Sequence, residues 1–230
     1  MIKRNPLPLL LGLALAGISS TAMAEQTGGW YFGVTGGQAK ADLDQDEMDA
    51  IVTDAFLSTG SSIISADSSL EDSDTSFSVF AGYRFFPALA VEAGYIDFGT
   101  AEYRAAGLVN PPGPVTSLPV SFATDFEVSG FTVAAIGAVP LGDNFDLHAR
   151  AGILFAKTEN SIAASSLGSV ASDRLSANSE DLHYGIGAGY HLGTHWSFTL
   201  DWVQFKDVGD EEETGEDDLE RLSLGVTYRL

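Results

Sequence analysis

Residues 221–230 read Arg-Leu-Ser-Leu-Gly-Val-Thr-Tyr-Arg-Leu, and apolar side chains alternate here with polar or small ones without interruption. Successive side chains of a β-strand point to opposite faces, so one face of this segment is apolar and the other is polar. Strands of about ten residues with this pattern build transmembrane barrels, in which lipid lies on one side and a polar lumen on the other. The segment therefore predicts a membrane-spanning strand.

The same alternation recurs at seven other places. It is clear at residues 77–85, 145–156, 182–192 and 196–202, and noisier at 30–39, 89–98 and 122–139. The connections alternate between tight (86–88, 140–144, 193–194) and long and polar (40–74, 100–121, 158–180, 206–218). Outer-membrane barrels have this layout. We therefore predict an all-β fold, an eight-stranded antiparallel up-and-down transmembrane β-barrel with short periplasmic turns and long extracellular loops.

Two apolar residues, Ile96 and Val203, break the alternation near the same end of their strands. We interpret both as β-bulges, which are common at barrel rims. The alternative is that strand pairing has ended there.

The N-terminus has the pattern of a secretory signal. Lys3 and Arg4 precede a short apolar run, and the run ends in the cleavage motif Ala22-Met23-Ala24. We predict a signal peptide over residues 1–24 and a barrel domain over 25–230. The alternative is an uncleaved anchor, for which the apolar run is short.

Composition narrows the functional classes. The formal net charge is −21, which argues against nucleic acid as a partner because binding phosphates requires a basic surface. The chain has no cysteine, which is compatible with export through an oxidising periplasm. After Ala24 no apolar run is long enough for a membrane-spanning helix.

Aromatic residues cluster at the two ends of the predicted strands, as they do at membrane interfaces. The alternative is the core of a soluble protein. One predicted belt, at the periplasmic end, comprises Trp30, Phe85, Phe145, Trp196 and Tyr228. The other comprises Phe77, Phe98, Phe126, Phe155, Tyr184 and Phe205.

Four charged residues lie within membrane-length strands: Arg84, Glu92, Arg150 and Asp201. Arg or Lys on the lipid face near the membrane centre costs about 2–4 kcal/mol, so these side chains should point into the lumen. There they must pair with one another or with water. We expect the glycines at 185, 187 and 189 to leave room for long side chains of neighbouring strands.

Three segments resemble the OmpA transmembrane-domain family: the closing strand 222–230, the hairpin formed by 80–87 and 91–95, and residues 140–152. The resemblance implies that Glu92 and Arg150 form interior salt bridges. The family's interior lysine has no counterpart, with Ala135 or Ile136 in its place, and its interior arginine of the seventh strand appears as Thr199. The expected lumen is therefore a polar plug, with a narrow gated pore as the alternative.

The resemblance also implies an assembly signal in the closing strand, formed by Gly225, Tyr228 and Leu230, where the family usually ends in Phe. The resemblance does not extend to the family's peptidoglycan-binding domain, so tethering to the cell wall is not expected.

An enzymatic function is not expected. Some outer-membrane barrels that act on lipid A use a His-x-Ser pair, and His195-Trp196-Ser197 has this spacing, but it lies at a turn predicted to face the periplasm. The other histidines, His148, His183 and His191, show no grouping with a serine and a carboxylate in the sequence. We expect no cofactor and no dedicated metal site.

The predicted loops are acidic, with Asp42, Asp44 and Asp46 in the first. Met48, Ile51, Val52 and Ala55 follow at helical spacing and predict a short amphipathic helix over the rim. The acidic residues indicate either a solvated surface or weak divalent-cation bridging to lipopolysaccharide.

We expect a monomer in the outer membrane, with membrane lipid, lipopolysaccharide and the barrel-assembly machinery as partners. The expected function is structural support of the envelope, with the acidic loops free to make contacts. A small-solute channel and a loop-mediated adhesion module are the alternatives, and lipid A modification is the least favoured.

Overall fold

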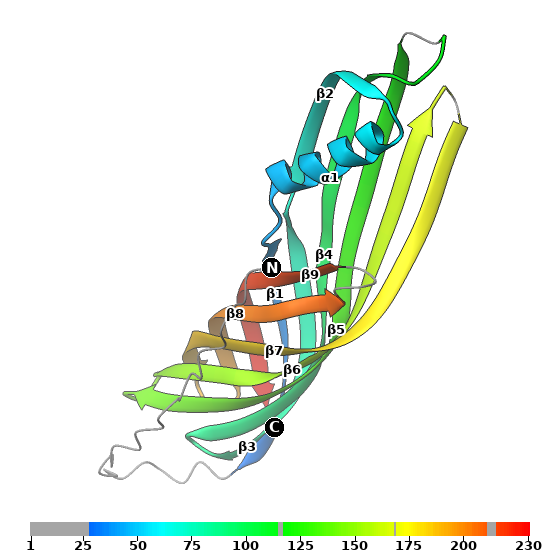
Figure 1. Ribbon diagram of the computed structural model, residues 1–230. Coiled ribbons are helices and arrows are strands. Elements are labelled where there is room, and N and C mark those ends of the chain that lie inside the picture. Colours follow the sequence, from blue (N-terminus) through cyan, green and yellow to red (C-terminus); the bar gives the residue numbers. More distant parts are fainter. Residues whose placement is uncertain (1–27, 115–116, 168, 211–214) are drawn as a thin grey trace, which may run out of the picture.

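The computed structural model describes residues 28–114, 117–167, 169–210 and 215–230 (Figure 1). The predicted signal peptide lies outside them. The elements, in chain order, are β1 (Gly29–Ala41), α1 (Gln45–Ser58), β2 (Ser62–Glu71), β3 (Ser73–Phe86), β4 (Leu89–Asn110), β5 (Leu118–Leu141), β6 (Phe145–Ser166), β7 (Ser169–Leu192), β8 (Trp196–Asp210) and β9 (Gly215–Arg229).

Eight strands close into a barrel, as predicted. From β3 to β9 each strand pairs antiparallel with the next, and β1 pairs with both β3 and β9 to complete the ring. Closure removes the unpaired edges of a sheet, which is what a bilayer requires of strands that cross it. The remaining strand, β2, is not part of the ring and pairs with the distal half of β4.

The outer surface of the barrel is apolar. Eight predicted belt residues lie on it with exposed fractions of 38–55%: Trp30, Phe77, Phe85, Phe145, Phe155, Tyr184, Trp196 and Tyr228. Apolar residues such as Ile186 and Leu224 lie between the belts, and they are 64% and 67% exposed. A surface of this kind is unfavourable in water and favourable against hydrocarbon.

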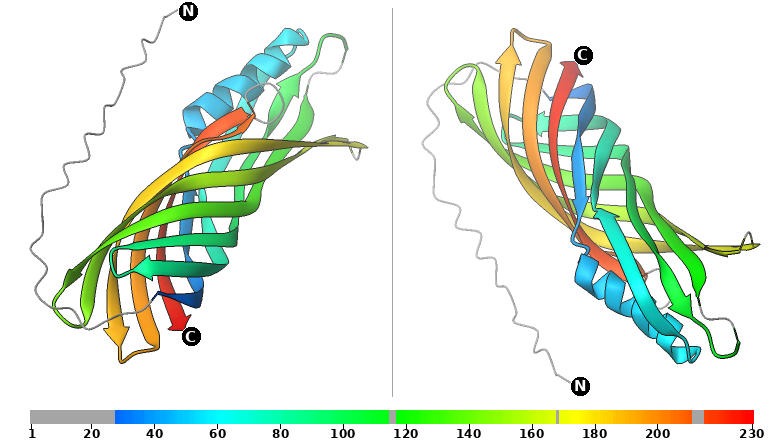
Figure 2. Two further views of the ribbon diagram at one scale, coloured as in Figure 1. Left: turned by 90° about the horizontal axis from the view of Figure 1, so that it is seen from below. Right: turned by 90° about the horizontal axis from the view of Figure 1, so that it is seen from above.

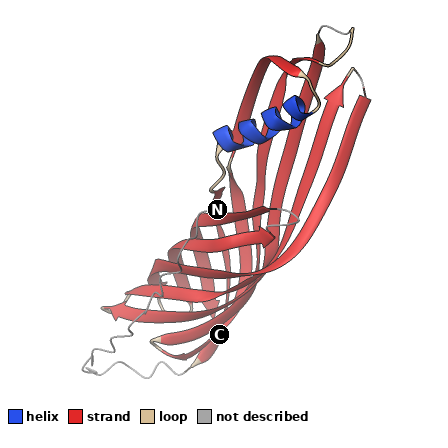
Figure 3. Ribbon diagram, viewed as in Figure 1, coloured by secondary structure: helices blue, strands red, loops and turns tan. Residues whose placement is uncertain are grey.

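The long connections are mostly β-structure rather than irregular loops. Strands β4 to β7 continue beyond the ring and, with β2, form a sheet that we call the extension (Figures 1 and 3). The tight connections at 87–88, 142–144 and 193–195 lie at the opposite end of the barrel, near the C-terminus (Figure 2). In the extension both faces of many strand segments are exposed to water, so the alternation that reveals the barrel strands is missing there.

The predicted bulges at Ile96 and Val203 are wrong. Both residues continue the inward-facing rows of β4 and β8, and their exposed fractions are 3% and 2%. The register shifts come later, between Asp97 and Thr100 in one strand and between Phe205 and Val208 in the other. Positive φ angles at Gly99 (81°) and Asp207 (53°) accompany them. The prediction failed because it assumed that every inward residue is polar.

The predicted helix is present as α1, beside β2 and over the extension (Figure 2). Asp44 caps its N-terminus, because its Oδ1 accepts hydrogen bonds from the backbone N–H groups of Asp46 (2.8 Å) and Glu47 (3.3 Å). No helix in the described residues is long and apolar enough to cross a membrane.

Candidate functional site in the barrel lumen

Three of the four predicted lumen charges meet inside the barrel. The Arg150 guanidinium, from β6, lies 3.1 Å from a Glu92 carboxylate oxygen on β4 and 3.8 Å from Asp201 on β8. Glu92 also accepts a hydrogen bond from the Tyr31 hydroxyl at 2.9 Å. Strand alternation directs Arg150, its two carboxylate partners and Tyr31 inward. In this low-dielectric space each of the three charged groups has a partner of opposite charge.

Histidines continue this contact network toward the turn end of the barrel. One ring nitrogen of His148 lies 2.8 Å from Asp201, and the other lies 2.9 Å from Asp146. The second oxygen of Asp146 lies 2.6 Å from Nε2 of His191. The network, which we call the polar layer, thus connects five strands: β1, β4, β6, β7 and β8.

A serine completes a grouping that sequence reasoning missed. Ser197 Oγ lies 2.8 Å from Nδ1 of His191, so Ser197, His191 and Asp146 are linked in series. The expectation that the histidines form no such grouping is therefore wrong. The signal was the hairpin register, since the tight turn at 193–195 sets His191 opposite Ser197.

This grouping resembles a nucleophile, base and orienting acid, but it has little space for a substrate. The cavity that it borders has a volume of about 50 Å³, against roughly 300–1,000 Å³ for an ordinary small-molecule site. Asp146 is also shared with His148. The other predicted candidate, His195, stacks on Tyr228 at 5.6 Å and interacts with Thr194.

Arg84, the fourth predicted charge, differs from the expectation. Its guanidinium lies 5.8 Å from the centre of the Tyr31 ring and donates to the Pro87 carbonyl at 2.9 Å, and no ion pair joins it to a described carboxylate. The Arg84 Nε atom is buried and has no hydrogen-bond partner among the described residues.

Arg221 is a buried charge that the prediction omitted. It donates to Ser76 Oγ and Thr35 Oγ1, each at 2.6 Å, and to Ser223 Oγ at 3.2 Å. The sequence signal for this charge was the position of Arg221 on the polar face of the closing strand, β9.

Glycines make room for these side chains. A Cβ atom at Gly187 would collide with His148 and Asp201, and one at Gly189 would lie 2.5 Å from an Asp146 oxygen. A Cβ at Gly225 would similarly lie 2.5 Å from the Thr199 hydroxyl.

An apolar cluster, which we call the plug, fills the lumen between the polar layer and the extension. It comprises Ala39, Ala41, Ile96, Phe98, Val128, Leu154, Ala156, Val203, Phe205, Val208 and Leu219, and the half-buried Phe126 packs against it. Leu154 and Val208 are fully buried. The prediction that Phe98, Phe126 and Phe205 belong to a lipid-facing belt is therefore wrong, because all three point inward.

Comparison with known families classifies the chain. The model of the OmpA-like transmembrane domain matches residues 25–230. The chain belongs to this family. As an OmpA-like transmembrane domain it is an outer-membrane β-barrel protein.

Individual relatives of this OmpA-like domain are distant. Outer membrane protein A of Serratia marcescens is 28% identical over 152 residues, which are 66% of this chain and 38% of that protein. The chain thus spans about two fifths of that relative's length.

Solved structures with a similar fold include Neisserial surface protein A (15% identity, 87% of this chain and 97% of that one, TM-score 0.47). The attachment invasion locus protein Ail of Yersinia pestis is another (14%, 88% and 97%, TM-score 0.45).

The described part of the OmpA-like domain contains no group of three or more His, Asp or Glu side chains arranged to hold a metal ion. At the C-terminus, the Leu230 N–H donates to the Trp30 carbonyl at 3.1 Å, and Tyr228 packs against Trp196 at 4.9 Å between ring centres. The role of Gly225, Tyr228 and Leu230 as an assembly signal stays a prediction.

Proposed function

We propose that the chain is a non-conducting structural barrel that stabilises the outer membrane. The observation that carries this proposal is the plug. A hydrated ion that entered the lumen would have to pass between apolar side chains such as Leu154 and Phe205, which are 0% and 2% exposed. Removing an ion from water in this way costs many kcal/mol, so the closed lumen favours a structural role over the channel alternative.

Conductance measurements test this proposal. Phe98 and Phe205 pack edge to face in the plug with 4.8 Å between ring centres. We expect the wild-type protein to be silent in a planar bilayer, and the double variant F98A/F205A to pass a measurable current. The lipid-facing variant F77A is the control and should stay silent. Steady wild-type channels at low voltage would contradict the proposal.

A genetic test addresses the structural role. Loss of the protein should increase the sensitivity of cells to detergents, and the wild-type chain should restore resistance. Membrane lipid and lipopolysaccharide are the proposed contacts, and monomer state, the assembly machinery and weak divalent-cation bridging stay predictions. We also propose that the protein is not an enzyme, which the small cavity beside Ser197 supports.

Adhesion is a second candidate because the extension projects beyond the ring (Figure 1), and because residues 169–176 of β7 are all exposed. A chain in which the extension is replaced by short turns separates the two functions. The structural proposal expects this chain to restore detergent resistance. Lost attachment to surfaces with intact resistance would instead support adhesion.

A further inference from the structure

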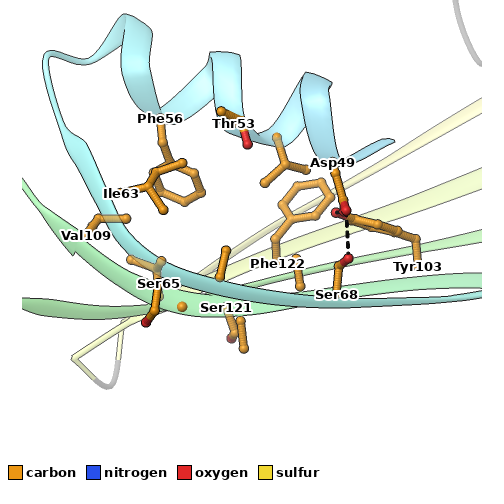
Figure 4. A pocket seen from close by; sticks show the side chains of 16 residues that line it. Asp49, Thr53, Phe56, Ile63, Ser65, Ser68, Tyr103, Val109, Ser121 and Phe122 are labelled. Atoms are coloured by element: carbon orange, nitrogen blue, oxygen red, sulfur yellow. Dashed lines mark hydrogen bonds between the residues drawn. The ribbon is translucent and has the colours of Figure 1, made fainter. Parts of the chain in front are cut away.

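A cavity of about 150 Å³ lies between α1 and the extension (Figure 4). Its roof is the side of the helix that carries Val52, Thr53 and Phe56. Its floor comes from β2, β4 and β5. The cavity is separate from the polar layer and the plug, and neither the barrel fold nor the structural role requires it.

The cavity exists because small side chains meet on the floor. Ala66 of β2 lies opposite Gly107 of β4, and Ala105 lies two residues before Gly107 on the same face. A Cβ atom at Gly107 would collide with the Ser65 carbonyl, so this position has to remain glycine. Large apolar side chains surround the floor, namely Val52, Phe56, Ile63, Val109, Val120 and Phe122. The result is an apolar chamber that none of its own side chains fills.

One end of the chamber is polar. The Asp49 carboxylate accepts a hydrogen bond from the Tyr103 hydroxyl at 2.6 Å and another from the Ser68 hydroxyl at 2.9 Å (Figure 4). Burial, with Asp49 beside it, raises the pKa of Tyr103 to about 12, so this hydroxyl stays protonated and serves as a donor. A carboxylate has about four acceptor sites, and two of those on Asp49 are used.

We propose that this chamber binds a small neutral aromatic molecule that carries one hydrogen-bond donor, with phenol as the simplest example. The ring occupies the apolar chamber, and the hydroxyl donates to Asp49. An enclosed apolar cavity of about 150 Å³ binds benzene, so the volume of this more open cavity and the apolar part of its lining suit a single aromatic ring. The carboxylate accepts but cannot donate, which selects a donor and excludes anions such as benzoate.

Methyl NMR of the full protein in lipid nanodiscs tests the inference. Ile63, Val52 and Val109 supply methyl probes in the cavity wall. We expect phenol to shift these signals saturably, toluene to shift them with about tenfold weaker affinity, and benzoate to leave them unchanged. Partition of phenol into the lipid would instead produce small shifts that do not saturate, and that outcome overturns the inference.

Substitutions distinguish phenol binding inside the cavity from binding at the protein surface. A105L fills the floor and should weaken phenol binding at least about tenfold. A123L is the matched control, because Ala123 follows Phe122 in β5 and points to the other face of the sheet. Should A105L displace α1, as amide signals of the helix would reveal, A66V fills the same floor from β2. Equal phenol affinity in the filled variants and the control overturns the inference.

The polar end has its own test. D49A should reduce the affinity for phenol to that for toluene and leave the affinity for toluene unchanged, so toluene serves as the folding control. Equal weakening of both compounds shows that Asp49 does not recognise the hydroxyl and overturns the proposed selectivity.

Discussion

At the scale of single residues, we expect the replacement of Arg150 to have the largest effect on stability, because its guanidinium pairs with both Glu92 and Asp201. The variant R150A leaves two carboxylates without this partner in a low-dielectric lumen. We expect a loss of about 3 kcal/mol in the free energy of unfolding, measured by urea denaturation in lipid vesicles.

A matched control for this prediction is K157A. Lys157 also forms an ion pair, 2.6 Å from Glu159, but its side chain is largely exposed on the outer face. Removal of an exposed pair costs at most about 1 kcal/mol. Equal losses in the two variants would show that the polar layer contributes no more than a surface pair.

We expect the stability of the folded state to depend on pH through Asp217, near the start of β9. Burial, together with the nearby carboxylates of Asp42 and Glu47, raises its pKa to about 6. The folded state therefore binds more protons than the unfolded state between the ordinary pKa of aspartate and this value. The stabilising contribution of the protonated group is present at low pH and is lost as the pH rises toward 6.

Hydrogen exchange of the α1 and β9 amides, corrected for the intrinsic rate, measures this effect. We expect the free energy of opening, measured by exchange, to fall by about 1 kcal/mol between about pH 4 and about pH 7. This figure is smaller than the full effect of the raised pKa because solvent screens the carboxylate. D217N should reduce the difference, and D54N, which alters an exposed carboxylate of α1, should retain it. An unchanged pH dependence in D217N would exclude Asp217 as the source.

Sequence reasoning succeeded for residues whose environment follows from parity and charge. Glu92, Arg150 and Asp201 could be placed in the lumen because a charge in a membrane-length strand has no tolerable outward position. It failed for Phe98 and Phe205, because an aromatic residue near a strand end fits both an interface and a core. The pattern does not contain the information that the lumen changes from polar to apolar along its length.

At the scale of elements, the cap of α1 provides a direct test. Asp44 satisfies two backbone N–H groups at the start of the helix, so D44A should destabilise α1 by about 1 kcal/mol. D44N is the control, because asparagine caps helices about as well as aspartate. Hydrogen exchange of the α1 amides measures both. Equal destabilisation by D44A and D44N would indicate that charge, rather than capping, stabilises the helix start.

The barrel strands were predictable, but their continuation was not. The alternation in β9 exists because one face meets lipid, so its cause ends where the bilayer ends. Beyond that point residues such as Ser161, Ser172 and Ser176 carry no pattern, and the hydrogen bonds between neighbouring strands are what extend the sheet. The bulge positions after Ile96 and Val203 were missed for a related reason, since both residues belong to an apolar interior.

At the scale of the whole molecule, the tight turns and the extension lie at opposite ends of the barrel. The general layout of outer-membrane barrels assigns the turns to the periplasm and the extension to the outside.

The absence of cysteine makes this orientation measurable with single substitutions. S172C introduces a thiol at an exposed position of the extension, and N144C introduces one at an exposed tight turn. A maleimide attached to a polymer too large for the outer membrane should label S172C in intact cells and N144C only after permeabilisation. The two variants control for each other, because both should react in detergent. Labelling of N144C but not of S172C in intact cells would show that the barrel has the opposite orientation. The cavity beneath α1 would then be accessible to periplasmic rather than external molecules.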